Sequence, residues 1–202
     1  MAGAGPAQVG LGVEYSESLS RLVLLLKTFL GWLYVGIPHG IALFILSFVA
    51  LALHVVAFVI VLFTGKYPRG IFDIMLGYHA WSVRVDAYLN LMTDKYPPFA
   101  LSAPDYPVYA HIEYPEEVSR GTAALRFFLG WLYVGIPHGI ALFVLGIVAF
   151  VAIVIGWFAI LFTGQFPRAL FDFVEGTMRW GLRVSAYMYL LNDKYPPFSL
   201  KP

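Results

Sequence analysis

Cysteine is absent from this chain of 202 residues, and charged side chains make up only 12% of it. Without cysteine the chain has no disulfide framework, thiolate metal site, iron–sulfur cluster or cysteine nucleophile. The net charge of +1 offers no electrostatic footprint for nucleic acid. A soluble domain carries about 25% charged residues. Half that amount cannot cover a water-facing surface, which argues against a soluble enzyme.

Apolar residues are plentiful instead, at 60% of the chain, with 17% aromatic residues. Tyr and Trp concentrate at membrane–water interfaces, so this composition predicts an integral membrane protein and not a disordered one. Residues 1–18 contain Glu14 and Glu17 and lack a basic start, so no secretory signal is expected there. The first apolar stretch is then a candidate uncleaved anchor.

The chain is internally duplicated. A shift of 99 residues aligns 13–100 with 112–199 without a gap and gives 47 identities in 88 positions. The longest identical block, Phe29–Phe44, recurs as Phe128–Phe143. The predicted organisation is therefore a tail (1–12), a first repeat (13–100), a linker (101–111) and a second repeat (112–199).

Each repeat is predicted to hold two membrane helices and one amphipathic helix. The ranges are 20–37, 39–63 and 69–92 in the first repeat, and 119–136, 138–162 and 168–191 in the second. Pro38 predicts a turn or sharp kink between the two membrane helices. Residues 41–63 contain no charge and are long enough to span a bilayer. Gly65 supplies a helix C-cap.

The third helix of the second repeat has a polar stripe, because its charged residues are spaced 4, 3, 4 and 4 apart. They are Arg168, Asp172, Glu175, Arg179 and Arg183. This pattern predicts a helix on the membrane surface, or one whose stripe packs on a partner. Outside the helices, residues 9–15 and 108–114 are predicted to pair as a small sheet.

The fold class is thus an all-α membrane protein made of a tandem repeat, with a helical hairpin or a kinked helix pair in each half. If the corresponding segments of the two repeats lie on the same side of the membrane, each repeat crosses the membrane twice. The Pro-His-Gly turn then lies at the far end of the helical hairpin. The positive-inside rule then places both termini in the cytoplasm. The rival arrangement has one span per repeat and an inverted second repeat.

Several motifs resemble a known bacterial family. They are Leu-Phe-Thr-Gly-x-[Tyr/Phe]-Pro-Arg, Phe-Asp-x-x-x-Gly, Trp-x-x-Arg-Val-x-Ala-Tyr and Asp-Lys-Tyr-Pro-Pro-Phe. In combination they are similar to those of small membrane proteins that carry a domain of unknown function, often in tandem. The resemblance covers both repeats and implies a membrane location, with no activity, cofactor or catalytic residue attached. The first repeat departs from the second at Leu76 and Ala80.

Three histidines are the candidate cofactor ligands. His39 and His138 recur before the charge-free segment, and His54 lies inside it. A haem or other tetrapyrrole is the cofactor such residues would hold. The plainer interpretation is an interfacial His that satisfies free N–H groups, since no second ligand stands at metal spacing. No metal and no catalytic residues are expected.

Basic residues of the third helix are the candidate lipid-binding residues, because Arg suits phosphate contact. They are Arg69, Arg84, Arg168, Arg179 and Arg183. Asp73 and Asp172 each stand four residues after an Arg, which favours an Arg–Asp pair over a catalytic carboxylate.

The sequence therefore predicts a non-catalytic membrane protein with lipids as partners. It would be an accessory or scaffold subunit of a larger membrane complex, or would associate with itself. The alternatives are a small-molecule or lipid transporter or channel, and a haem- or pigment-binding subunit. Motifs for phosphate binding, dinucleotide binding and hydrolysis are absent.

Overall fold

The structure is a computed structural model that describes residues 8–202. Most of the predicted tail, residues 1–7, lies outside the described residues. The first half contains β1 (Val9–Val13), α1 (Arg21–Gly31), the π-helical segment η1 (Trp32–Gly36), α2 (Ile37–Thr64) and α3 (Arg69–Leu89). The second half repeats this order with β2 (Val108–Ile112), α4 (Arg120–Gly130), η2 (Trp131–Gly135), α5 (Ile136–Thr163) and α6 (Arg168–Met188).

The predicted turn at Pro38 is wrong, because α1, η1 and α2 form one helix, and of the two predicted arrangements only the kinked helix pair is compatible with that continuity. This helix runs from Arg21 to Thr64, and its counterpart from Arg120 to Thr163, with 44 residues in each. Pro38 lies in the first turn of α2, where the preceding π-helical turn shifts the hydrogen-bond register and the N–H of Ile37 donates to the carbonyl of Trp32. The hairpin topology, and the cytoplasmic orientation inferred from it, therefore lose their basis.

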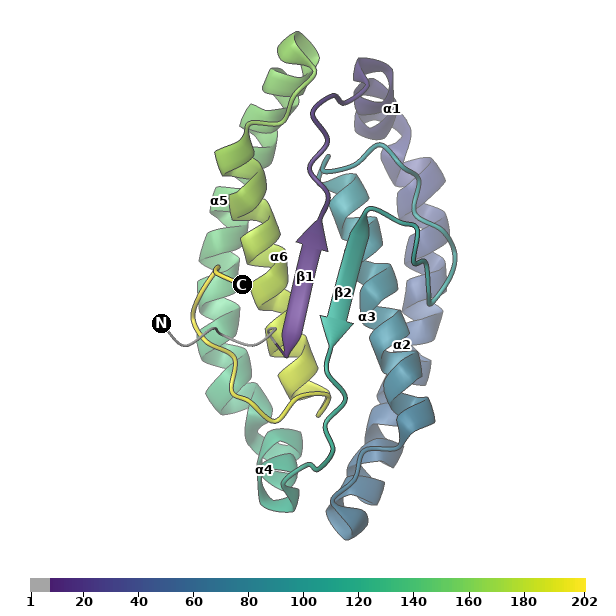
Figure 1. The fold of residues 1–202 in the computed structure, drawn as a ribbon, viewed down its shortest axis with the longest axis vertical. Helices are drawn as coiled ribbons and strands as arrows, with labels where there is room; N and C mark the ends of the chain where they lie inside the picture. Colours follow the sequence, from purple (N-terminus) through teal and green to yellow (C-terminus); the bar gives the residue numbers. More distant parts are fainter. Residues whose placement is uncertain (1–7) are drawn as a thin grey trace.

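The two long helices run antiparallel, and the ends of one meet the ends of the other (Figure 1). Ser20 and Ser119 cap their N-termini, and Gly65 and Gly164 close their C-termini with φ of 72° and 80°. The Gly65 cap confirms the predicted helix end. Arg21 donates to the carbonyls of Leu161 and Phe162 at 2.9 and 3.1 Å. A cation at the C-terminus of the second helix complements its dipole.

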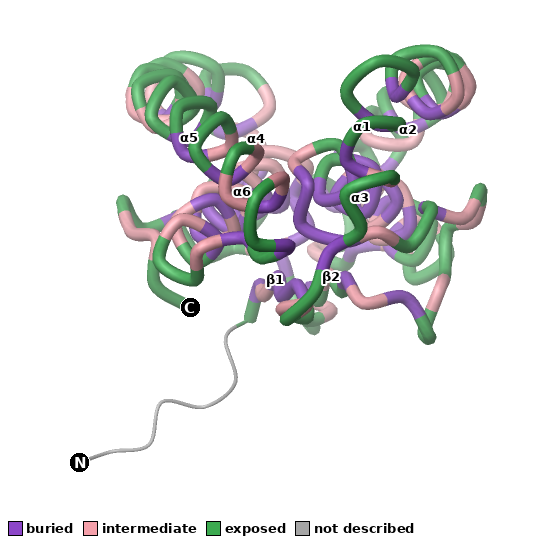
Figure 2. Tube along the Cα trace, turned by 90° about the horizontal axis from the view of Figure 1, so that it is seen from above, coloured by how far each residue is buried: buried purple, intermediate pink, exposed green. Residues whose placement is uncertain are grey.

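The molecule has three layers, which the view along its long axis separates (Figure 2). The long helices form one outer layer, α3 and α6 the middle layer, and the two strands the opposite face. α3 and α6 each pack on a long helix on one side and on a strand on the other. This arrangement fits the predicted alternative in which the polar stripe packs on other protein, and a place on the membrane surface stays a prediction.

The predicted pairing of residues 9–15 with 108–114 is confirmed. β1 and β2 are antiparallel, with Leu11 opposite Ala110 at the centre of the register. These two residues are related by the 99-residue repeat, so the pseudo-two-fold axis passes between them. Each strand serves the other half of the chain, since β1 packs on α6 and β2 packs on α3.

The long helices present little of their surface to the rest of the protein. Only 22% and 17% of their most apolar windows are buried. Residues such as Leu24, Val35, Ala50, Ala57 and Val61 form one buried stripe, while large apolar side chains elsewhere, including Phe29, Phe44, Phe48 and Phe63, are exposed. The core helix of a soluble protein is mostly buried, which these two helices are not, and both are long and apolar enough to cross a membrane.

Candidate functional site: the proline break and its aromatic strap

The most distinctive site lies where Pro38 interrupts the long helix. Proline has no N–H, so the carbonyl of Tyr34, four residues earlier, loses its helical donor. The hydroxyl of Tyr96 donates to that carbonyl at 3.0 Å. In the second repeat, the hydroxyl of Tyr195 donates to the carbonyl of Tyr133 at 3.3 Å. The Tyr-Pro-Pro-Phe segment thus replaces a hydrogen bond that the proline removes.

Each segment Asp-Lys-Tyr-Pro-Pro-Phe (residues 94–99 and 193–198) is called the strap below. It crosses the proline break and covers the histidine there. His39 stacks on Phe99 with ring centroids 3.8 Å apart, and His138 stacks on Phe198 at 4.0 Å. Both histidines are fully buried, at 0% exposure.

A tryptophan from the middle layer fixes each histidine ring. The indole N–H of Trp81 donates to Nδ1 of His39 at 3.0 Å, and that of Trp180 to Nδ1 of His138 at 2.9 Å. The remaining nitrogen of His138 lies 3.1 Å from the Tyr195 hydroxyl. The corresponding nitrogen of His39 is buried and has no partner in the part of the chain that the structure describes.

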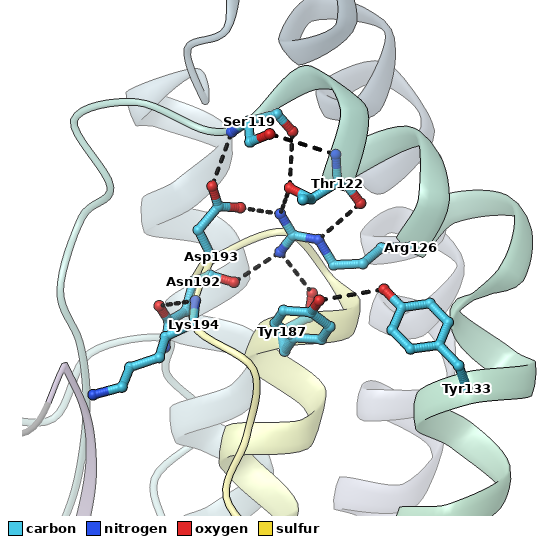
Figure 3. A network of polar contacts seen from close by, with 8 residues as sticks. All are labelled: Ser119, Thr122, Arg126, Tyr133, Tyr187, Asn192, Asp193 and Lys194. Atoms are coloured by element: carbon cyan, nitrogen blue, oxygen red, sulfur yellow. Dashed lines mark hydrogen bonds and ion pairs between the residues drawn. The ribbon is translucent and has the colours of Figure 1, made fainter.

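A buried cation ties each strap to the start of the long helix. Arg126 donates to the carbonyl of Asn192 at 2.8 Å, pairs with Asp193 and lies over the ring of Tyr187 (Figure 3). The Asp193 carboxylate also accepts from the backbone N–H of Ser119 at 2.9 Å, so it serves the N-cap. One guanidinium therefore joins α4, α6 and the strap.

Lys27 takes the same place in the first repeat. Its ammonium donates to the carbonyl of Thr93 at 2.6 Å, lies 3.6 Å from the Asp94 carboxylate and sits over the ring of Tyr88. Because Lys and Arg fill equivalent positions, the role is to pair with the carboxylate and hold the strap carbonyls, and it does not depend on guanidinium geometry.

Three of the predicted lipid-binding arginines are buried within the protein. Arg84, Arg179 and Arg183 are 3%, 8% and 8% exposed. Arg84 donates to the carbonyl of Ala100, just after the first strap, and Arg183 to that of Ser199, just after the second. Desolvation by burial lowers the pKa of both Arg84 and Arg183. We therefore no longer expect lipid contact from these three.

Arg69 and Arg168 remain at the surface, with 66% and 62% of their side chains exposed. Each pairs with the Asp four residues later, Asp73 and Asp172, as the spacing predicts. Lipid phosphate binding stays a prediction for these two arginines.

The first repeat carries a second group of histidines without counterparts in the other half. His54 and His79 both lie against the Tyr189 ring, at 5.1 and 5.2 Å between centroids. Each has one buried ring nitrogen without a partner among residues 8–202. Burial lowers the pKa of His79 to about 4, so this ring is neutral at pH 7. The matching positions of the second repeat are Ile153 and Met178.

The chemistry that these groups can perform is limited. Within residues 8–202, no group of three His, Cys, Asp or Glu side chains is placed to hold a metal ion. Nδ1 of His39 and of His138 already accepts from a tryptophan, and Nε2 of His138 meets the Tyr195 hydroxyl, so these nitrogens are engaged within the protein. The recurrent residues instead form a clamp that holds the long helix at its weakest point.

The repeated histidines stand out in the sequence, but their partners do not. The signal was present, because a proline inside an apolar run leaves a carbonyl that needs a donor from elsewhere. Tyr96 recurs with the same spacing from Pro38 as Tyr195 has from Pro137. Lys27 and Arg126 stand near the start of an apolar segment, and nothing in the sequence indicates their buried roles.

No curated protein and no solved structure matches this chain. One family model does match, and it does so twice, at residues 26–100 and 125–199. The two matches are offset by the same 99 residues as the internal repeat, and each ends at a strap. The chain therefore belongs to the family defined by the domain of unknown function DUF4389, which it carries in tandem duplicate.

Proposed function

We propose that this chain is a non-catalytic membrane protein whose two long helices lie within one leaflet, parallel to the membrane plane. The observation that carries the proposal is the layered arrangement, with the exposed apolar helices on one face and the strands on the opposite face (Figure 2).

The length of the helices favours this orientation over a crossing one. At about 1.5 Å per residue, 44 residues extend about 66 Å. A hydrocarbon core about 30 Å thick would contain that length only at a tilt of roughly 60°, whereas spanning helices tilt by about 0–40°. A helix is about 10–12 Å across with its side chains, which fits within one leaflet.

The charge distribution supports the same orientation. No charged residue stands between Lys27 and Lys66, or between Arg126 and Arg168. Exposed charges, including Glu113 on the strand side, belong to the other layers or to the helix ends. If the long axis crossed the membrane, the strands and the arginines of α3 and α6 would lie at mid-membrane depth, which is costly.

Cysteine labelling tests this orientation directly, because the natural chain contains no cysteine. Single variants Glu17→Cys and Lys66→Cys mark the two ends of one long helix, and Glu113→Cys marks the strand side. In sealed vesicles, an impermeant maleimide should label all three from the same side. Labelling of the two helix ends from opposite sides would show a crossing helix and refute the in-plane arrangement.

Phe48→Cys supplies the control for membrane insertion itself. Phe48 is exposed in the middle of the long helix, so this thiol should react only after detergent is added. A protein that carbonate strips from membranes, or that labels freely at this position, would contradict membrane embedding as a whole.

The role proposed for the embedded protein is structural: an accessory or scaffold subunit, or a self-associating protein, in a bacterial cytoplasmic membrane. The enclosed clamp supports this role, since its polar groups form hydrogen bonds and ion pairs that hold the strap in place. Purification in mild detergent should yield a complex or an oligomer that retains lipid. A lone monomer free of lipid would contradict it. Neither transport nor tetrapyrrole binding gains a specific observation from residues 8–202.

A further inference from the structure

The two halves of the chain differ beside α3, where the first repeat has a hollow of about 360 Å³. Its lining includes Leu76, Gly77 and Ala80 of α3, together with Leu101 and Ala110. The lining comes from α3, the segment after the first strap and β2, and includes no residue of the long helices.

In the second repeat the equivalent space holds the side chain of Arg179. Its Nε donates to the carbonyl of Leu11 at 2.9 Å, and its Nη1 donates to the carbonyl of Leu200 at 3.1 Å. Its other terminal nitrogen pairs with Glu175. The repeat shift places Ala80 where Arg179 stands and Leu76 where Glu175 stands. The hollow is thus the space that an arginine side chain fills in the other half.

The carbonyls that receive Arg179 are retained around the hollow. In an antiparallel pair, residues that are hydrogen-bonded to each other alternate with residues that are not. The N–H groups of Glu14 and Glu113 donate to the carbonyls of Pro107 and Gln8, at the two ends of the strand pair. By this alternation, Leu11 and Ala110 face each other without hydrogen bonds between them. The carbonyls of these two residues therefore point away from the sheet, to opposite edges. One meets Arg179, and the other faces α3 and the hollow.

The carbonyl of Leu101 occupies the position in the first repeat that the carbonyl of Leu200 has in the second. The carbonyl oxygen of Leu200 lies 2.9 Å from where a Cβ on Gly176 would stand, and that of Leu101 lies 3.3 Å from the same point on Gly77. Within residues 8–202, no side chain donates to the carbonyl of Leu101 or Ala110. Both oxygens line the hollow, where no described side chain takes the place that Arg179 has in the second repeat.

A cation in this hollow has a precedent in the other half. Arg84 lines the hollow, and its counterpart Arg183 already lies beside Arg179. Asp73 also borders the hollow and supplies negative charge at its rim.

We propose that the hollow beside Ala80 is a binding site for a guanidinium group supplied by another molecule, which donates to the carbonyls of Leu101 and Ala110 as Arg179 does to Leu200 and Leu11. Two sources share this chemistry: a free alkylguanidine and an arginine side chain of another polypeptide. Hydrogen bonds from a charged donor to a carbonyl oxygen are stronger than those from a neutral donor, so a guanidinium gains affinity where a neutral or non-donating group does not.

Calorimetric titration of the full chain with ethylguanidinium chloride tests the proposal, with ethylurea as the uncharged control. The natural chain should bind one equivalent, and Ala80→Arg should abolish binding by filling the hollow with its own guanidinium. Arg179→Ala should open the second hollow, bind two equivalents and recover thermal stability when ethylguanidinium is added. If Ala80→Arg does not fold, Ala80→Leu blocks the same space.

Unchanged binding by the Ala80 variants would overturn the proposal, as would binding by Arg179→Ala when the natural chain binds nothing. Equal binding of ethylurea would also overturn it. N-acetylarginine amide distinguishes the two sources. If it binds more tightly than ethylguanidinium, the site takes an arginine side chain, and if it is excluded, the site takes a free alkylguanidine.

Discussion

The pairing of Pro38 with Tyr96 makes a prediction that a double-mutant cycle can test. If Tyr96 compensates for the missing N–H of Pro38, then removing its hydroxyl should matter only while the proline is present. The variants are Tyr96→Phe, Pro38→Ala and the double variant. Alanine restores an N–H that can reach the carbonyl of Tyr34.

The expected magnitude follows from the contact. The Tyr96 hydroxyl donates to a helix carbonyl at 3.0 Å, and one such hydrogen bond contributes about 0.5–1.5 kcal/mol net. For a chain of this length, 1 kcal/mol shifts the melting temperature by about 2–4 °C. Tyr96→Phe should therefore lower the melting temperature of the natural chain by about 1–6 °C, and that of Pro38→Ala by close to zero.

Thermal unfolding followed by far-ultraviolet circular dichroism in bicelles measures all four proteins. Tyr109→Phe is the matched control, because Tyr109 is an exposed strand residue without a helix carbonyl to serve, and its change should be negligible. An equal loss from Tyr96→Phe in both backgrounds would refute the compensation. Tyr195 and Pro137 provide an independent copy of the test.

Three further outcomes are expected from thermal unfolding. Arg126→Ala should cost about 1–3 kcal/mol, since it leaves the carbonyls of Tyr187 and Asn192 without their donor and Asp193 without its cation. Arg126→Lys should keep most of the stability because Lys27 performs the same role, and equal losses would contradict this. Gly176→Ala should lower the melting temperature because its Cβ would stand 2.9 Å from the carbonyl oxygen of Leu200. Gly181→Ala, with open space around it, should raise stability by up to about 1 kcal/mol. A gain from both variants would show that the segment around Leu200 moves to make room. His79 has a pKa of about 4 in the folded protein, below its unfolded value, so the unfolded state binds more protons. Stability should therefore fall as the pH drops from about 6.5 to 4, by at most about 1.4 kcal/mol per pH unit. His79→Met, which installs the residue of the second repeat, should flatten this slope, and an unchanged slope would assign it to other groups.

The repeat, the strand pair and the glycine caps could be predicted because each depends on nearby residues. Val9–Val13 and Val108–Ile112 alternate along their own length, and Gly65 ends a helix by its own φ. The continuity of the long helix could not be predicted in that way. Pro38 ends a helix by local rules, and the donor that offsets it comes from Tyr96, in a separate segment beyond α3.

The charged stripe of α6 shows a second limit of prediction from sequence. Its spacing places Arg179 and Arg183 on one face, but a face suited to water or lipid phosphate is equally suited to backbone carbonyls. The strap end and β1 supply those carbonyls. Which surrounding such a face receives depends on segments that only the folded chain brings together.

The exchange of strands between the halves has a consequence for how such a protein is assembled. β1 precedes the first repeat but packs on α6 of the second, and β2 does the reverse. Neither half is complete alone, since each lends a strand and borrows one. The molecule is in effect a domain-swapped dimer joined into one chain, in which the linker converts a concentration-dependent encounter into an intramolecular one. A protein with a single copy of the repeat would complete its fold only by meeting a second molecule, whereas this chain carries its partner with it.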